Sequence, residues 1–249
     1  MKIKRILISQ PKPADIERSP YYNIISNYNI QCDFHKFIKI EGVTTQEFRL
    51  QKIYLQDYGA VIMTSRNAVD NFFRIAKEAR YEIPDSLKYF CNSESTAFYL
   101  QKYIRYRKRK VFHSNNFPEG IMEKILKHKD EKFLLPCSDA STSEIPELLD
   151  KEGIAYKEVV LYKTLSSDLS HLNLNDYDMI VLFTPSGVKS IFDNFPDFKQ
   201  DKILISAYGE ATHKAIKEAG LRLDIETPTP EAPSMSMAIE NYLKENQKK

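Results

Sequence analysis

Short runs of apolar residues recur along the chain without the polar alternation of a half-exposed strand. Residues 179–183 and 203–205 are two such runs. Strands that helices cover on both faces of a sheet have this continuous pattern. Residues 1–8 are basic and then apolar, and their apolar stretch is too short for a signal-peptide core. They therefore predict a first strand of the same buried kind.

The order of apolar strand, small hydroxylated loop and helix occurs twice along the chain. The matching segments are 58–73 with 177–192, 29–32 with 153–156, and 93–96 with 209–212. Their order is the same in both halves. Each half predicts strand, helix, strand, then strand, helix, strand, helix, strand, helix, which is typical of a parallel sheet covered on both faces. The sequence therefore predicts an α/β fold built of doubly wound lobes.

Glycines mark two of the predicted helix ends. Gly153 and Gly220 each follow a charged helical segment and precede an apolar residue. Glycine adopts the left-handed conformation that ends many helices without a steric penalty. We therefore expect helices to stop at these two positions and strands to follow.

Composition narrows the functional classes. The 249 residues can form one large domain or two smaller ones, and 42% apolar with 28% charged residues is ordinary for a globular protein. No apolar run approaches the roughly 20 residues of a membrane span. The three cysteines form no CxxC pair and predict neither disulfides nor a zinc site, so we expect a reducing cytoplasm. A net charge of +2 argues against a nucleic-acid domain.

Residues 102–110 hold the one local excess of basic residues, interleaved with two tyrosines. This run predicts a solvated helix end and loop. Two alternatives are the steering of an anionic ligand and the binding of nucleic acid, which would be steeply salt-dependent.

Polar loops follow several predicted strands. They are residues 64–67, 92–96, 138–142, 184–187 and 208–212. Ligands of open parallel sheets bind beyond the carboxyl ends of the strands, where backbone N–H groups and the positive ends of helix dipoles suit carboxylates or phosphates. Each hydroxyl in these loops can also be a simple helix cap. Two matched sets of loops predict two anion-binding edges which, if the lobes face each other, form one wide cleft.

Sharper chemical motifs are missing from the sequence. It contains no GxGxxG, P-loop, HExxH or GxSxG string, which removes the usual support for nucleotide-binding, zinc-protease and serine-hydrolase functions. The five histidines fall at no metal-ligand spacing, and we expect most of them at the surface and no metal site. The carboxylates show no arrangement that indicates an acid/base pair.

Several short motifs, in order, resemble the uroporphyrinogen-III synthase family over nearly the whole chain. They are Thr64-Ser65, Thr96-Ala97, and residues 134–137, 151–154, 160–164, 183–187, 208–212 and 228–231. The resemblance implies two flavodoxin-like lobes joined by a two-stranded linker, with a cleft between them. It places residues 1–36 and 168–249 in one lobe, 47–156 in the other, and the linkers at 37–46 and 157–167, whereas the repeat alone would divide the chain near residue 125.

The resemblance also implies an activity. The family's substrate is hydroxymethylbilane, a linear tetrapyrrole with acetate and propionate groups on every ring, and a polyanion fits the anion-binding edges. The terminal hydroxyl leaves as water, and the last pyrrole is inverted through a spiro intermediate. The substrate supplies the reactivity, so no cofactor is expected. Orientation can contribute roughly 7–11 kcal/mol in favourable systems. We expect a monomer with no nucleic-acid or membrane partner.

Tyr162 matches the family's tyrosine and is the candidate catalytic residue, because a protonated phenol can donate a hydrogen bond to a departing hydroxyl. The alternative is that it simply packs a strand. The candidate substrate-binding residues, matched by motif, are Thr64, Ser65, Thr96, Thr184, Ser186, Gly187, Gly209 and Thr212.

Three features depart from the family pattern. Ser93 stands where glycine is usual and Arg66 where proline is common, and the loop 138–143 lacks the usual glycine and basic residue. These departures leave open a second hypothesis, a non-catalytic binding or regulatory protein for a polyanionic ligand.

Overall fold

The structure is a computed structural model that describes residues 2–114, 118–141 and 144–246. Its helices and strands alternate along the chain. The elements are β1 (Arg5–Ile8), α1 (Tyr22–Tyr28), β2 (Gln31–Phe34), β3 (Ile38–Gly42), α2 (Thr45–Leu50), β4 (Ala60–Met63), α3 (Arg66–Glu78), β5 (Lys88–Cys91), α4 (Glu94–Tyr99), β6 (Val111–His113), α5 (Glu119–Leu126), β7 (Phe133–Ser138), α6 (Ile145–Lys151), β8 (Tyr156–Ser166), β9 (Met179–Leu182), α7 (Pro185–Asn194), β10 (Leu204–Tyr208), α8 (Glu210–Glu218), β11 (Ile225–Thr227) and α9 (Met235–Asn246). Short 3-10 turns lie at Leu55–Asp57, Leu100–Lys102 and Leu174–Asp176.

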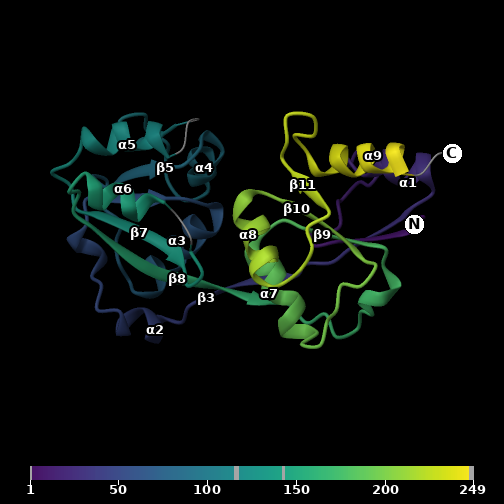
Figure 1. The fold of residues 1–249 in the computed structure, drawn as a ribbon. Helices are drawn as coiled ribbons and strands as arrows, with labels where there is room; N and C mark the ends of the chain where they lie inside the picture. The colour runs from purple at the N-terminus through teal and green to yellow at the C-terminus, as the bar shows by residue number, and fades with distance from the viewer. Residues whose placement is uncertain (1, 115–117, 142–143, 247–249) are drawn as a thin grey trace. The chain divides into compact units, whose positions relative to one another are not determined.

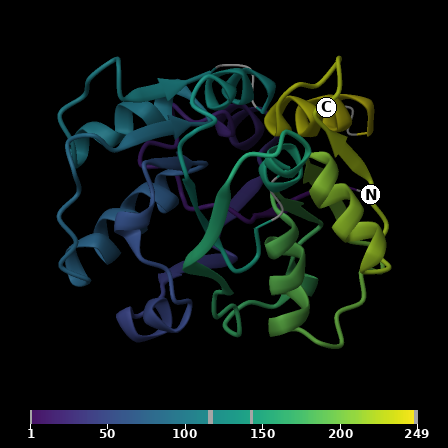
Figure 2. The ribbon, with the colours of Figure 1, turned by 90° about the vertical axis from the view of Figure 1, so that its left-hand side faces the viewer.

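The chain divides into two compact units (Figure 1). Unit 1 consists of residues 1–39 and 165–249, and unit 2 of residues 40–164. Both ends of the chain lie on unit 1, as Figures 1 and 2 show from two directions. β3 and β8 carry the chain across the two boundaries.

The sheet of unit 1 has the strand order β2-β1-β9-β10-β11, and every neighbouring pair is parallel. Counted along this unit, that is the order 2-1-3-4-5 of doubly wound, flavodoxin-like sheets. Alternate residues of β9 face opposite sides: Met179 and Val181 pack in the cluster with α1 and α9, and Ile180 and Leu182 in the cluster with α7. Figure 1 shows α1 and α9 beside each other on one side of the sheet. The predicted fold class is confirmed.

Unit 2 repeats this arrangement from different parts of the chain. Its strand order is β3-β8-β7-β4-β5-β6, and the pairs from β8 to β6 are parallel. Taking β7 and β8 as the first two strands again gives 2-1-3-4-5. Each sheet thus combines strands from both halves of the repeat, because β1 and β2 join β9 to β11 while β7 and β8 join β4 to β6.

β3 is the added edge strand of unit 2. The Val43 N–H donates to the Leu161 carbonyl at 3.0 Å, and the Ser167 N–H donates to the Phe37 carbonyl at 2.9 Å. From Phe37 to Val43 the residue numbers rise, while their partners fall from Ser167 to Leu161. β3 therefore runs antiparallel to β8.

The predicted helix ends are confirmed, and the basic run lies in a turn and loop as predicted. Gly153 has φ of 64° and Gly220 of 72°, both left-handed, and each follows the C-cap residue of its helix, α6 or α8. Residues 103–110 form a loop after a 3-10 turn and before β6. Part of the charge in this loop is paired, because Arg107 and Lys110 both form ion pairs with Asp85. Among the described residues, no helix is long and apolar enough to cross a membrane.

Candidate functional site

The polar loops predicted to bind anions stand at the carboxyl ends of parallel strands. In unit 2, residues 64 and 65 follow β4 and open α3, and residues 92 and 93 follow β5 and open α4. In unit 1, Thr184 follows β9 and opens α7, and Gly209 follows β10 and opens α8. The fifth loop begins at the end of β7, but its Thr142 and the neighbouring Ser143 lie outside the described residues.

Three hydroxyls of these loops cap helices. Ser65 accepts a hydrogen bond from the Ala68 N–H at 3.0 Å, Ser93 from the Thr96 N–H at 3.2 Å, and Thr184 from the Gly187 N–H at 3.1 Å. The capping role that the sequence left open is therefore confirmed at these positions. Capping uses a lone pair of each oxygen and leaves its hydroxyl proton for a second hydrogen bond, which Ser93 donates to the Asn92 side chain at 3.4 Å.

The other predicted binding residues differ in how far they are exposed. Thr64 and Ser186 are half-buried. Thr96 and Thr212 are only 4% and 2% exposed, and their backbone N–H groups donate to Ser93 and Gly209 inside their own loops. These two threonines therefore shape the loops from within.

Gly209 has φ of 85° and ψ of 145°, a conformation that L-residues rarely adopt. We expect Gly209→Ala to lower the stability of unit 1 by about 1–3 kcal/mol, because the strain falls on the backbone although nothing lies within 4 Å of an added Cβ. Thermal unfolding of the purified variant measures this loss.

Gly187→Ala is the matched control. An added Cβ there would meet the Thr184 hydroxyl at 3.4 Å, and no positive φ opposes it. In the first turn of a helix we expect this change to be neutral or stabilising by up to about 1 kcal/mol. Equal destabilisation by both variants would contradict the backbone explanation.

A β-bulge sets the direction of Tyr162. In the pairing of β7 with β8, Cys137 lies opposite Val160 and Ser138 opposite Tyr162, so Leu161 is an extra residue. Regular alternation would send Leu161 and Tyr162 to opposite faces. Instead both belong to the core cluster of α3, together with Val159. The bulge thus turns the phenol to the face of the sheet where α3 begins.

Tyr162 is 7% exposed, and its hydroxyl lies 3.2 Å from the hydroxyl of Ser65, the N-cap of α3. The structure therefore brings together the predicted catalytic residue and one predicted binding residue. Burial raises the pKa of Tyr162 above its ordinary value, and the contact with Ser65 opposes this only in part. The phenol consequently keeps its proton at neutral pH.

Two groups beside Tyr162 were not predicted from the sequence. The Asp139 N–H donates to the Tyr162 carbonyl at 3.2 Å, and its carboxylate accepts from the Thr164 N–H at 3.0 Å. Lys163 pairs with Glu47 at 2.5 Å, which lowers the pKa of that carboxyl to about 2. Asp139 lies in a loop that the sequence singled out, but only the pairing of β7 with β8 reveals its neighbours.

The three cysteines are free thiols, and none of them is exposed. Burial raises the pKa of the Cys137 thiol to about 11, so it is protonated at neutral pH. Of the five histidines, His171 is exposed and the other four are half-buried, and none is fully buried. His128, for example, packs against the rings of Phe90 and Phe112. The described residues include no cluster of three or more histidine, cysteine or carboxylate side chains able to hold a metal ion.

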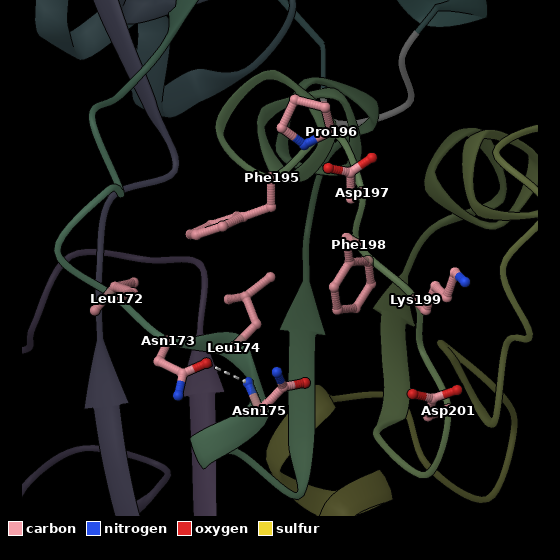
Figure 3. A pocket seen from close by; sticks show the side chains of 10 residues that line it. All are labelled: Leu172, Asn173, Leu174, Asn175, Phe195, Pro196, Asp197, Phe198, Lys199 and Asp201. Atoms are coloured by element: carbon pink, nitrogen blue, oxygen red, sulfur yellow. Dashed lines mark hydrogen bonds between the residues drawn. The ribbon is translucent and has the colours of Figure 1, made fainter.

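Unit 1 also contains a pocket of about 450 Å³ away from the polar loops (Figure 3). It is formed by residues 172–175, which precede β9, and residues 195–199 and 201, which precede β10. It is therefore at the amino ends of these strands and contains none of the predicted site residues.

Comparison with known proteins gives a consistent result. The sequence model of a family described as "Uroporphyrinogen-III synthase HemD" matches residues 30–236. A relative named uroporphyrinogen-III synthase, from Chlorobaculum parvum, is 23% identical over 258 residues, which cover 97% of this chain and 100% of the relative.

Two solved structures are similar in fold. Uroporphyrinogen-III synthetase of Helicobacter pylori has a TM-score of 0.63 at 16% identity, covering 98% of this chain and 100% of its own. A mutant uroporphyrinogen III synthase of Thermus thermophilus has a TM-score of 0.58 at 12% identity, with the same coverage. At these identities the structural likeness supports the fold alone.

Proposed function

The chain belongs to the uroporphyrinogen-III synthase family, and we propose on this premise that it converts hydroxymethylbilane to uroporphyrinogen III. The terminal hydroxyl gains a proton and leaves as water, which gives an azafulvene cation. The far pyrrole attacks the cation through its substituted carbon, and the spiro intermediate rearranges to the inverted ring with loss of a proton, so that water and the neutral macrocycle are the products. The observation that carries the proposal for the site is the 3.2 Å approach of the Tyr162 and Ser65 hydroxyls at the carboxyl edge of the unit 2 sheet.

Tyr162 assists the departure of the hydroxyl. The Ser65 oxygen already accepts the Ala68 N–H, so its own proton is free to be donated to the phenol oxygen. The phenol proton then points to the leaving hydroxyl of the substrate. Hydrogen bonds in such a chain strengthen one another, and the donation from Ser65 stabilises the negative charge that develops on the phenol oxygen.

The loops at the carboxyl edges bind the acetate and propionate groups. In unit 1, Thr184, Ser186 and Gly187 form the first turn of α7, and Gly209 opens α8. In unit 2, Thr64 precedes α3, and the proton of its N-cap Ser65 is used by Tyr162. The N-termini of helices favour carboxylates through their unpaired N–H groups and the positive ends of their dipoles. Thr96 and Thr212 support the loops from within and keep these groups in place.

Holding the substrate in one geometry is the larger part of the work, because the substrate can close without help to the uninverted isomer. Orientation of reacting groups can lower a barrier by roughly 7–11 kcal/mol in favourable systems. The reactivity comes from the substrate, and no step of this mechanism requires a cofactor. We also propose that the protein is a monomer and is located in the cytoplasm. Light scattering on the purified protein tests whether it is a monomer.

The decisive experiment is a turnover assay. Freshly prepared hydroxymethylbilane is added to the purified protein without metal or cofactor, and isomers I and III are separated after oxidation. We expect isomer III in large excess over the protein-free control. Isomer I alone, formed at the control rate, would contradict the proposal. Binding of a tetrapyrrole without turnover would then favour the non-catalytic binding protein.

A further inference from the structure

Arg74 connects three parts of unit 2 through one guanidinium. It projects from α3 and is half-buried. Its Nη2 donates to the Val43 carbonyl at 2.8 Å and to the Leu161 carbonyl at 3.3 Å. The same side chain donates through Nε to Asn71 at 3.2 Å and through Nη1 to Glu78 at 3.1 Å. A planar fork of donors is suited to such multiple contacts, whereas a lysine ammonium is not.

One of these acceptors belongs to the bulge that directs Tyr162. Leu161 is the extra residue of the bulge, and its carbonyl accepts both the Val43 N–H and the Arg74 guanidinium. We call the contacts of Arg74 with the Val43 and Leu161 carbonyls the bulge clamp. Because Leu161 directly precedes Tyr162, the clamp limits rotation of the backbone that carries the phenol.

Gly42 makes room for the clamp. A Cβ at this position would lie 2.5 Å from Nη2 of Arg74 and 2.6 Å from the side-chain oxygen of Asn71. Any other residue there would displace the guanidinium or Asn71. The clamp can therefore be disturbed in two independent ways, at Arg74 itself and at the opposing strand.

We propose that Arg74 is a positioning residue for the reaction: by clamping the Leu161 bulge, it fixes the phenol of Tyr162 beside Ser65. A single helix then determines both ends of this arrangement, because Ser65 caps α3 and Arg74 lies more than two turns further along it. This inference rests on the proposed function of Tyr162 in uroporphyrinogen III formation.

The test compares Arg74→Gln and Gly42→Ala with Lys77→Gln, which removes a cation from an exposed position on the same helix. We expect the first two to lower kcat for isomer III by about tenfold to a hundredfold with little change in KM, because a small misplacement of a catalytic group has effects of this size. Lys77→Gln should leave kcat unchanged. In a Tyr162→Phe background, Arg74→Gln should cause no further loss.

A second readout does not depend on turnover. The NMR spectrum of protein labelled with ¹³Cζ-tyrosine contains one resonance for each tyrosine. The Tyr162 resonance is identified as the one that is missing from the spectrum of Tyr162→Phe. We expect it to titrate at lower pH in Arg74→Gln than in the wild type, because a released ring gains water. If Arg74→Gln does not fold, Gly42→Ala tests the same clamp.

Two outcomes would overturn the inference. The first is a loss of kcat in Arg74→Gln that adds fully to the loss caused by Tyr162→Phe. The second is a pH titration of the Tyr162 resonance that is unchanged in both Arg74→Gln and Gly42→Ala. Absence of isomer III formation by the wild type would instead refute the proposed function, while the titration would still report on the clamp.

Discussion

Tyr162→Phe should lower the rate of isomer III formation by about a hundredfold, at the lower end of what general acid catalysis contributes. The substitution removes only the hydroxyl from a side chain that is 7% exposed, so packing is retained and stability should change by no more than about 1 kcal/mol. KM should change little, because the lost hydrogen bond forms as the hydroxyl departs. Initial rates with separation of isomers I and III measure the effect.

Ser65→Ala is the companion variant. It removes the partner of the phenol and the N-cap of α3, so we expect a smaller loss of activity together with a stability loss of about 1 kcal/mol. The double variant should be no slower than Tyr162→Phe alone, because Ser65 acts through the phenol. Wild-type activity in Tyr162→Phe would assign the rate enhancement to substrate orientation instead.

The pH dependence of the reaction follows from the same burial. Burial raises the pKa of Tyr162 above its ordinary value of 10. The acid form is therefore present at neutral pH and is lost only as pH rises through this elevated value. The difference in rate between the wild type and Tyr162→Phe should thus stay constant from about pH 7 to 9. A fall in this difference near neutral pH would point to another titrating group.

The elements of this fold could be predicted because their signals are local. Buried parallel strands appear as continuous apolar runs, and Gly153 and Gly220 end helices because their left-handed backbone disfavours other residues. The carboxyl-edge loops follow from the order of strand and helix. Such features depend on a few neighbouring residues, which a single sequence contains.

The grouping of strands into sheets could not be derived from the repeat. Similar halves predict similar elements, but they do not predict which strands pair. β1 and β9 are far apart in sequence and are neighbours in one sheet, and this pairing depends on packing between distant segments. Here the resemblance to a family supplied the topology. Internal similarity alone would have divided the chain near residue 125.

The orientation of the Tyr162 side chain also could not be predicted from the local sequence. Alternation along β8 predicts that Leu161 and Tyr162 face opposite sides of the sheet. The bulge overrides this pattern, and it arises from the pairing of β8 with β7 and from contacts made by Arg74 and Val43. No local signal in residues 156–166 marks the extra residue.

Phe90→Ala should have the largest effect on stability, a loss of about 3–5 kcal/mol in the free energy of unfolding of unit 2. Phe90 is fully buried, and its ring centroid lies 4.8 Å from that of Phe112 and 5.2 Å from that of Phe133. Such a loss is a large fraction of the 5–15 kcal/mol that typically stabilises a domain. Phe98→Ala is the control, because this ring is 54% exposed and its loss should cost no more than about 0.5 kcal/mol.

Hydrogen exchange followed by mass spectrometry suits this comparison, because it reports on each unit separately. We expect Phe90→Ala to speed exchange in peptides of residues 40–164 and to leave peptides of unit 1 protected. Uniform deprotection of the whole chain would show that the two units unfold together.

At temperatures below its unfolding midpoint, the Phe90→Ala variant should still form isomer III at the wild-type rate per folded molecule. Phe90 belongs to the core cluster with α5 and α6, whereas Tyr162 belongs to the cluster with α3, so the two side chains lie on opposite faces of the unit 2 sheet. A cavity on one face leaves the bulge clamp on the other intact. A fall in activity beyond the loss of folded protein would mean that the sheet transmits the disturbance to Tyr162, and that its position depends on both cores.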